Sequence, residues 1–367
     1  MNENNKPLLV LTGGGTAGHV MPHIAMLQTY IDAGFRLAYI GSDGIEKSLM
    51  ESQGEVISFH QIQVGKLRRY LSLKNLTDVF RIVVGFLQSL VILRKLKPAL
   101  VFSKGGFVSV PVAYAAKLLG IPVVSHESDL TPGLANKLIT PIASKLLYSF
   151  PDSKPFLPEA RSQLVGIPVR RALLEGDKDR ALEFLGFVDE QKPTILVMGG
   201  SLGAQKINET LLEALPQLVE RHQIVHVTGK GKTIDFSHAN YRSFEFLNEE
   251  LGDVMALCNL VISRAGANSI FEFLALKKPM ILIPLEAGSR GDQIQNADCF
   301  KKMGVARVLR EADLCKSKLC ELIERSLADT SMFDLGSANV PEAFRRSASE
   351  QIMKIIAQLT AVKGVRS

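Results

Sequence analysis

Short apolar runs alternate with longer stretches of helical periodicity along the chain. After the first run, residues 8–11, the side chains of Ile24, Leu27 and Tyr30 are spaced as on one face of a helix. The other apolar runs are residues 36–40, 55–59, 98–103, 122–125, 194–198, 260–263 and 280–284. Strands that alternate with helices form parallel sheets covered by helices on both faces. The sequence therefore predicts an α/β fold built on doubly wound parallel sheets.

Three glycine-rich turns follow predicted strands. They read TGGGTAGH at residues 12–19, KGGFVS at 104–109 and GGSLGA at 199–204. Such turns let backbone N–H groups approach a ligand, and a following helix adds partial positive charge, so the first turn suits an anion or an electron-rich oxygen. Ligands of parallel sheets bind at the carboxyl ends of the strands, where these turns lie. The first turn also fits the dinucleotide-binding pattern G-x-G-x-x-G, which leaves a dehydrogenase as one alternative.

Length and repetition predict two domains. A chain of 367 residues is long for one hydrophobic core. Residues 194–204 repeat the strand and glycine turn that open the chain. Residues 164–171, which include Gly166 and Pro168, are the predicted interdomain linker.

Composition is that of an ordinary globular protein, with 46% hydrophobic and 22% charged residues and a net charge of +6. The first residues are polar without an apolar segment, so no secretory signal is expected. The four cysteines show no paired metal-binding spacing, which favours reduced thiols in a cytoplasmic protein. No apolar run reaches the roughly 20 residues that span a bilayer.

A basic segment, residues 66–97, surrounds the apolar residues 82–93. Apolar residues flanked by basic ones suit a helix that rests on an anionic membrane surface. A buried crossover helix with solvated ends is the alternative that this segment leaves open. Nucleic acid is not an expected partner, because the segment lacks the regular interleaving of basic residues and aromatic side chains that stack on bases.

Two histidines stand at predicted strand ends. His19 lies where the first glycine turn becomes a helix, and His126 with Glu127 follows the strand at 122–125. An unperturbed histidine titrates near neutral pH, as a general base requires. The catalytic candidates are therefore His19, His126 and Glu127, with Glu127 expected to orient His126.

The second half contains a candidate nucleotide site at residues 264–272, RAGANSIFE. The N–H groups at a helix start can bind a diphosphate, and Glu272 can accept both hydroxyls of a ribose. The amides of residues 290–297 can hydrogen-bond sugar hydroxyls. Asp177 and Asp179 match the metal-binding D-x-D pattern, but they follow Gly176 rather than a strand and are predicted to start a helix. No metal site is predicted.

These segments together resemble the MurG family of peptidoglycan N-acetylglucosaminyltransferases, which convert lipid I into lipid II. The resemblance rests on residues 13–19, 105–109, 126–127, 199–201, 264–272 and 293–297. It implies the GT-B fold, in which two Rossmann-like domains face each other across a cleft. The implied domains are residues 1–166, facing acceptor and membrane, and 167–342, binding the donor, with a C-terminal helix at 343–367 joining the first domain.

The resemblance also implies the substrates. UDP-GlcNAc would be the donor, lipid I (undecaprenyl-diphosphate-MurNAc-pentapeptide) the acceptor, and no cofactor would be needed. Leu247 would present its backbone to uracil, Glu272 would hold the ribose, and Gln293 would bind sugar hydroxyls. The other implied donor contacts are Thr16, Ala17, Gly18, Asp129, Arg170, Ser201, Ala267, Asn268, Ser269, Ile270 and Phe271. At Ser128-Asp129 other family members also have Gln-Asn.

The implied reaction is a single inverting displacement at the anomeric carbon by the 4-hydroxyl of MurNAc. His19 is the favoured base and His126 the second candidate. The resemblance further implies a peripheral protein at the cytoplasmic face of the plasma membrane, in contact with anionic lipid and with other cell-wall enzymes. The alternatives are another GT-B transferase that glycosylates a membrane lipid, and a non-catalytic protein that senses UDP-sugars.

Overall fold

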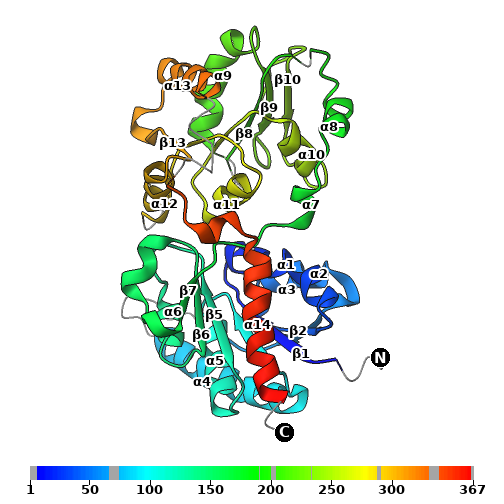
Figure 1. Ribbon diagram of the computed structural model, residues 1–367, viewed down its shortest axis with the longest axis vertical. Coiled ribbons are helices and arrows are strands. Elements are labelled where there is room, and N and C mark those ends of the chain that lie inside the picture. The colour runs from blue at the N-terminus through cyan, green and yellow to red at the C-terminus, as the bar shows by residue number, and fades with distance from the viewer. Residues whose placement is uncertain are drawn as a thin grey trace. The chain divides into compact units, whose positions relative to one another are not determined.

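The chain divides into two compact units, Met1–Pro168 with Arg346–Ser367, and Val169–Arg345. The computed structural model describes residues 6–65, 74–189, 191–199, 204–232, 234–286, 291–329 and 339–364. Each unit is built on one parallel β-sheet, with seven strands in the first and six in the second (Figure 1). This confirms the predicted α/β class with two parallel-sheet domains.

In the first unit the strand order is β3-β2-β1-β4-β5-β6-β7. The strands are β1 (Leu8–Thr12), β2 (Arg36–Gly41), β3 (Ser58–Gln61), β4 (Leu100–Ser103), β5 (Val123–Glu127), β6 (Lys145–Tyr148) and β7 (Ser162–Leu164). The strands β2 and β3 are added on one side of β1, and the strands from β4 onward are added on its other side. Such a switch point, here between β1 and β4, leaves a crevice at the carboxyl ends of the strands. Two of the glycine turns follow β1 and β4.

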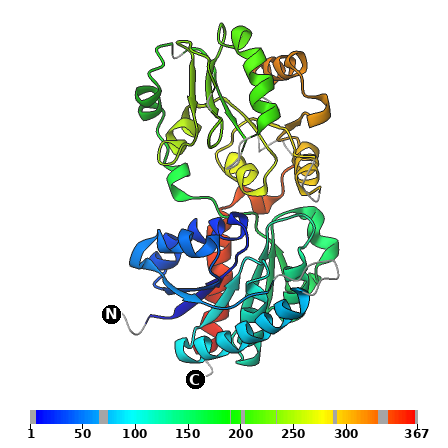
Figure 2. The ribbon, with the colours of Figure 1, turned by 180° about the vertical axis from the view of Figure 1, so that it is seen from behind.

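Alternate residues of the strands fill two separate cores. Leu9 and Leu11 of β1 pack beneath α2 and α14, whereas Leu8 and Val10 pack beneath α4 and α5 (Figures 1 and 2). The helices of this unit are α1 (Met21–Ile24), α2 (Leu27–Asp32), α3 (Ile45–Glu51), α4 (Lys74–Leu96), α5 (Ser109–Leu118), α6 (Leu134–Ile139) and α14 (Ala348–Gly364). This double layer is why the strands are apolar on both faces.

The long helix α4 is the crossover between β3 and β4. Its Leu93 is fully buried in the core beneath α4 and α5. Its other face is apolar as well, but exposed: the exposed fractions are 69% for Phe80, 50% for Val83, 54% for Leu87 and 68% for Val91. The segment is therefore a crossover helix that also carries an uncovered apolar stripe. Within the described ranges, every helix falls short of the length and apolarity that crossing a bilayer requires.

In the second unit the strand order is β10-β9-β8-β11-β12-β13. The strands are β8 (Thr194–Met198), β9 (Gln223–Val227), β10 (Tyr241–Phe244), β11 (Leu260–Ser263), β12 (Met280–Leu282) and β13 (Arg307–Val308). The helices are α7 (Arg171–Leu174), α8 (Lys178–Leu185), α9 (Gln205–Leu218), α10 (Leu251–Leu257), α11 (Ala267–Ala275), α12 (Asp292–Lys302) and α13 (Lys316–Ala328). The switch point here lies between β8 and β11, so the turn that precedes α11 stands at its edge.

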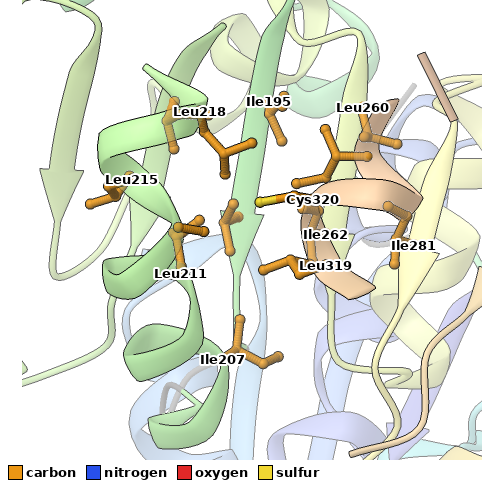
Figure 3. Packing of buried hydrophobic residues seen from close by; sticks show 14 of the residues in the cluster. Ile195, Ile207, Leu211, Leu215, Leu218, Leu260, Ile262, Ile281, Leu319 and Cys320 are labelled. Atoms are coloured by element: carbon orange, nitrogen blue, oxygen red, sulfur yellow. The ribbon is translucent and has the colours of Figure 1, made fainter. Parts of the chain in front are cut away.

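The core of the second unit joins α9 and α13 to one face of this sheet. Leu211, Leu215 and Leu218 of α9 belong to one buried cluster with Ile195 and Ile262 of the strands (Figure 3). The α9 residues lie three or four positions apart, which places them on one helix face.

Neighbouring leucines of α9 provide a test of this packing. Leu211 is fully buried and Leu212 is 41% exposed. Leu211→Ala should lower the free energy of unfolding of the second unit by about 2–5 kcal/mol, because it leaves a cavity in the core. Leu212→Ala, the matched control, should change it by less than about 0.5 kcal/mol. Urea denaturation followed by circular dichroism measures both, and equal effects would contradict the packing described.

Candidate functional site

A buried carboxylate holds the first glycine turn. Glu46, in α3, is fully buried, and its Oε2 accepts a hydrogen bond from Gly15 N at 3.3 Å, while Oε1 accepts one from Ser42 N at 3.0 Å. A Cβ at Gly14 would lie 2.7 Å from this carboxylate. A negative charge therefore already occupies the N–H side of the turn and repels a second anion there. This argues against the dehydrogenase alternative, which requires a pyrophosphate at this turn.

The single helix predicted after this turn is wrong. The chain forms a 3₁₀ turn, Ala17–His19, and then the short helices α1 and α2. His23 in α1 is fully buried, and its Nε2 donates to Thr12 O at 3.1 Å. One helical turn sums few peptide dipoles, so α1 adds little positive charge to the glycine turn.

His19 is half-buried at the rim of this turn. Its Nδ1 lies 3.0 Å from Gly14 O and 3.2 Å from Thr16 Oγ1. A carbonyl oxygen only accepts hydrogen bonds, so Nδ1 carries the proton. In the neutral ring the lone pair that can accept a proton is then on Nε2. Of the implied sugar contacts beside His19, Thr16 and Gly18 are exposed and Ala17 is half-buried.

The second candidate base, His126, is fully buried at the end of β5. Lys104 Nζ donates to His126 Nδ1 at 2.9 Å, and His126 Nε2 donates to Ser149 Oγ at 3.0 Å. Ser149 Oγ in turn donates to Glu127 O at 2.8 Å. Burial, reinforced by the charge of Lys104, lowers the pKa of His126 well below its ordinary value. His126 is thus a neutral member of an internal hydrogen-bond network.

Glu127 does not orient His126, contrary to our expectation. Its carboxylate accepts from Asp129 N at 2.9 Å, from Gly133 N at 3.0 Å and from Asn136 Nδ2 at 2.8 Å. These partners fix the loop between β5 and α6. Asp129 itself is half-buried in that loop.

Sequence reasoning missed Lys104. Its side chain is 1% exposed, and its ammonium donates to Ser128 Oγ at 2.7 Å as well as to His126. Its position in the sequence could have identified it, because Lys104 directly follows the apolar strand β4 at the expected ligand-binding edge. The same turn requires glycine at Gly106, where φ is +79° and a Cβ would lie 2.2 Å from Gly14 O.

In the second unit the turn before α11 is positioned by a buried arginine. Arg264 donates to Ile283 O at 3.2 Å and pairs with Glu311. Ala267, Asn268 and Ser269 form the half-buried first turn of α11. N–H groups of a first turn have no acceptor within their own helix and are available to a ligand.

Two of the implied donor contacts, Ile270 and Phe271, have core side chains. Ile270 is fully buried, and the Phe271 ring packs edge-on at 5.4 Å from Phe300 and 5.1 Å from Phe344. Only the backbone of these two residues can serve a ligand. Leu247 is half-buried in the turn after β10.

Glu272 and Arg170 form an ion pair. Arg170 Nη2 lies 3.3 Å from Glu272 Oε1, with side-chain exposures of 32% and 15%. Burial raises the pKa of Glu272, and the Arg170 charge opposes that rise. The pair brings together two residues that the sequence analysis assigned to one ligand.

Gln293, Ser201 and Asp177 are the remaining residues that the sequence singled out. Gln293 of α12 is half-buried and accepts from Leu285 N at 2.9 Å. Ser201 lies outside the described residues. Asp177, predicted to start a helix, caps α8: its Oδ1 accepts from Asp179 N and Arg180 N at 2.9 Å each. That prediction is confirmed.

Two parallel-sheet units, each with loops at the switch point of its sheet, have the architecture of a GT-B glycosyltransferase fold. Residues 9–148 match the Glycosyltransferase family 28 N-terminal domain, and residues 194–352 match the Glycosyltransferase family 28 C-terminal domain. The chain therefore belongs to glycosyltransferase family 28, and its 47% identity over 95% of its length to a curated relative places it in the MurG family within it.

Curated relatives are named UDP-N-acetylglucosamine–N-acetylmuramyl-(pentapeptide) pyrophosphoryl-undecaprenol N-acetylglucosamine transferase. The relative from Lachnospira eligens is 47% identical over 352 residues, 95% of this chain and 98% of its own length. The relative from Clostridium perfringens is 44% identical over 354 residues, 93% of this chain and 98% of its own length.

Solved structures share the fold. A crystal structure of MurG from Acinetobacter baumannii superimposes with a TM-score of 0.73 at 22% identity, covering 96% of this chain and 99% of that chain. The calicheamicin glycosyltransferase CalG4 gives 0.70 at 14% identity, covering 97% of this chain and 99% of that chain.

The buried state of His23 predicts a pH dependence of stability. Burial lowers the pKa of His23 from 6.5 to about 3. Between these values the unfolded chain binds a proton that the folded chain does not, so stability falls as the pH drops below 6.5. Between pH 6.5 and 5, wild type should lose about 1.5 kcal/mol more than His23→Phe. Urea denaturation at both pH values measures this difference, and equal losses would show that folding does not lower the pKa of His23.

Proposed function

We propose that this chain transfers N-acetylglucosamine from UDP-GlcNAc to the 4-hydroxyl of MurNAc in lipid I, producing lipid II. The observation that carries this proposal is the 47% identity to a transferase of that name across 95% of the chain. The loops at both switch points provide groups suited to such a reaction.

The proposed donor site lies in the second unit. The first turn of α11, with Ala267, Asn268 and Ser269, would bind the diphosphate, because its N–H groups and dipole favour an anion. Glu272 would hold the ribose hydroxyls, and Arg170, now paired with it, would contact the diphosphate. Leu247 would meet the uracil through its backbone, and Ser201 would complete the diphosphate loop.

The sugar of the donor has its own proposed contacts. Gln293 would bind hydroxyls of the GlcNAc through its side-chain amide. Thr16, Ala17, Gly18 and Asp129 are also proposed as sugar contacts. Ile270 and Phe271 would contribute backbone groups alone, since their side chains are buried.

His19 is the proposed general base. The hydroxyl of the acceptor must lose its proton as it attacks the anomeric carbon, and the neutral His19 ring carries its lone pair on Nε2. His126 and Glu127 are proposed as supports of the loop after β5, because their polar groups bond within the protein. Charge on the departing UDP would be stabilised by the α11 N–H groups and by Arg170.

An assay of UDP release tests the assignment of His19 as the general base. His19→Ala should lower kcat for UDP release in the presence of a lipid I analogue by about 10²–10⁴-fold, the usual contribution of a general base. Binding of UDP, measured by calorimetry, should be unchanged. His60→Ala, a half-buried histidine of β3, is the control and should retain activity. An unchanged kcat in His19→Ala would remove His19 as the base, and wild type that releases no UDP with this acceptor would reject the proposed transfer.

We also propose that α4 holds the protein against the cytoplasmic face of the plasma membrane. Phe80, Val83, Leu87 and Val91 recur every three or four residues, so they share one helix face. Arg81, Arg94 and Lys95 on the same helix are exposed. An apolar stripe with adjacent cations suits the surface of an anionic bilayer, where the acceptor lipid resides.

Vesicle co-sedimentation tests the α4 surface. Val83→Asp with Leu87→Asp should reduce partitioning onto vesicles containing phosphatidylglycerol by about tenfold or more, since it places two charges in the stripe. Val188→Asp, at an apolar residue of the second unit that is 94% exposed, is the control and should partition as wild type. Equal partitioning of all three proteins would contradict the role of α4, and binding to neutral vesicles that is insensitive to salt would contradict the role of the cations.

A further inference from the structure

A buried cation lies at the switch point of the first unit. Lys104 directly follows β4, and its backbone N–H donates to Thr12 O at 2.9 Å, next to the first glycine turn. Its side chain is 1% exposed. A buried ammonium loses its hydration and is retained only where the protein supplies strong partners.

The partners of Lys104 connect the ends of neighbouring strands. Its ammonium donates to Ser128 Oγ at 2.7 Å and to His126 Nδ1 at 2.9 Å, and His126 reaches Ser149 directly after β6. Ser149 Oγ also lies 3.2 Å from Gly166 O, beyond β7. One hydrogen-bonded network thus joins the carboxyl ends of β4, β5, β6 and β7.

We propose that Lys104 is a positioning residue for the transfer reaction, fixing residues 126–129 so that Asp129 is presented to the sugar. This inference rests on the proposed function. Ser128 and Asp129 follow the end of β5, and the two ends of this short segment are held differently. The carboxylate of Glu127 holds the backbone at Asp129 N, and the ammonium of Lys104 holds the Ser128 side chain. Loss of the ammonium would release one of these two restraints.

The charges around Lys104 make its role depend on pH. Glu127 and Asp129 attract its proton, His23 and His126 are neutral neighbours, and burial outweighs the carboxylates and lowers the pKa of Lys104 to about 7. As the pH rises through this value the ammonium loses its charge, and with it the attraction to Asp129. The profile of kcat/KM, which reports groups of the free enzyme, should therefore fall on its alkaline side.

The test compares Lys104→Met with wild type in UDP release from UDP-GlcNAc at saturating lipid I analogue. Lys104→Met should lower kcat/KM at pH 7 by about tenfold, because methionine fills the volume but makes neither hydrogen bond. The alkaline limb of the wild-type profile should be absent from this variant. The Kd for UDP should be unchanged, since the nucleotide contacts are proposed in the second unit. Lys145→Met, at the amino end of β6 and therefore at the opposite edge of the sheet, is the matched control and should keep both limbs.

A second variant tests the inference should Lys104→Met fail to fold. Ser128→Ala removes one acceptor of the Lys104 ammonium and leaves the buried charge in place, so kcat/KM should fall by less and the alkaline limb should remain. Wild-type kcat/KM and a retained alkaline limb in Lys104→Met would overturn the inference, and so would a parallel loss of UDP binding, which indicates a structural role. Absence of transfer by wild type would reject the proposed function and this inference with it, whereas transfer by wild type and Lys104→Met alike would reject the inference alone.

Discussion

Backbone N–H groups that leave the carboxyl ends of parallel strands need acceptors, and the first unit meets this need from within. The Glu46 carboxylate accepts from Gly15 N, and the Glu127 carboxylate accepts from Asp129 N and Gly133 N. The two glutamates therefore fix both loops by accepting hydrogen bonds from their backbone N–H groups.

The second unit has the opposite arrangement at its own switch point. The first turn of α11 is half-buried and offers N–H groups, and Glu272 of the same helix is paired with Arg170. This pair balances the charge of a partly buried carboxylate. The two sheets share the strand order around their switch points, yet the N–H groups of the first loops are bonded to carboxylates of the protein, whereas the first turn of α11 offers its N–H groups.

The fold class could be predicted because its strands are apolar on both faces and end in glycine. The strands β6, β7, β9, β10 and β13 fall outside the predicted apolar runs. In β9 the run is interrupted by His226, whose burial depends on Tyr241 and Asn208 as partners. The segment after the first turn was predicted as one helix because its apolar residues have helical spacing. The hydrogen bond from His23 to Thr12 O is a tertiary contact, which this spacing does not reveal.

The candidate site was predicted less completely than the fold. Position along the strands predicted that these loops follow the carboxyl ends of the strands, but not which of their side chains are buried. His126 and Glu127 looked alike in sequence, as polar residues at a strand end, and both are occupied by internal partners. Lys104 resembled any surface lysine, and only its neighbours in space distinguish it.

The core beneath α14 combines both ends of the chain. Ile352, Ile355 and Ile356 of α14 pack with Leu9, Leu11 and Tyr30. A ribosome releases the first sheet before the second unit and α14 after it, so Leu9 and its neighbours lack their covering helix while the whole second unit is made. The second unit, Val169–Arg345, is continuous and can complete its core sooner. The domain that is made first is therefore the one that finishes folding last, and its open apolar face is the surface that a chaperone would meet on the nascent chain.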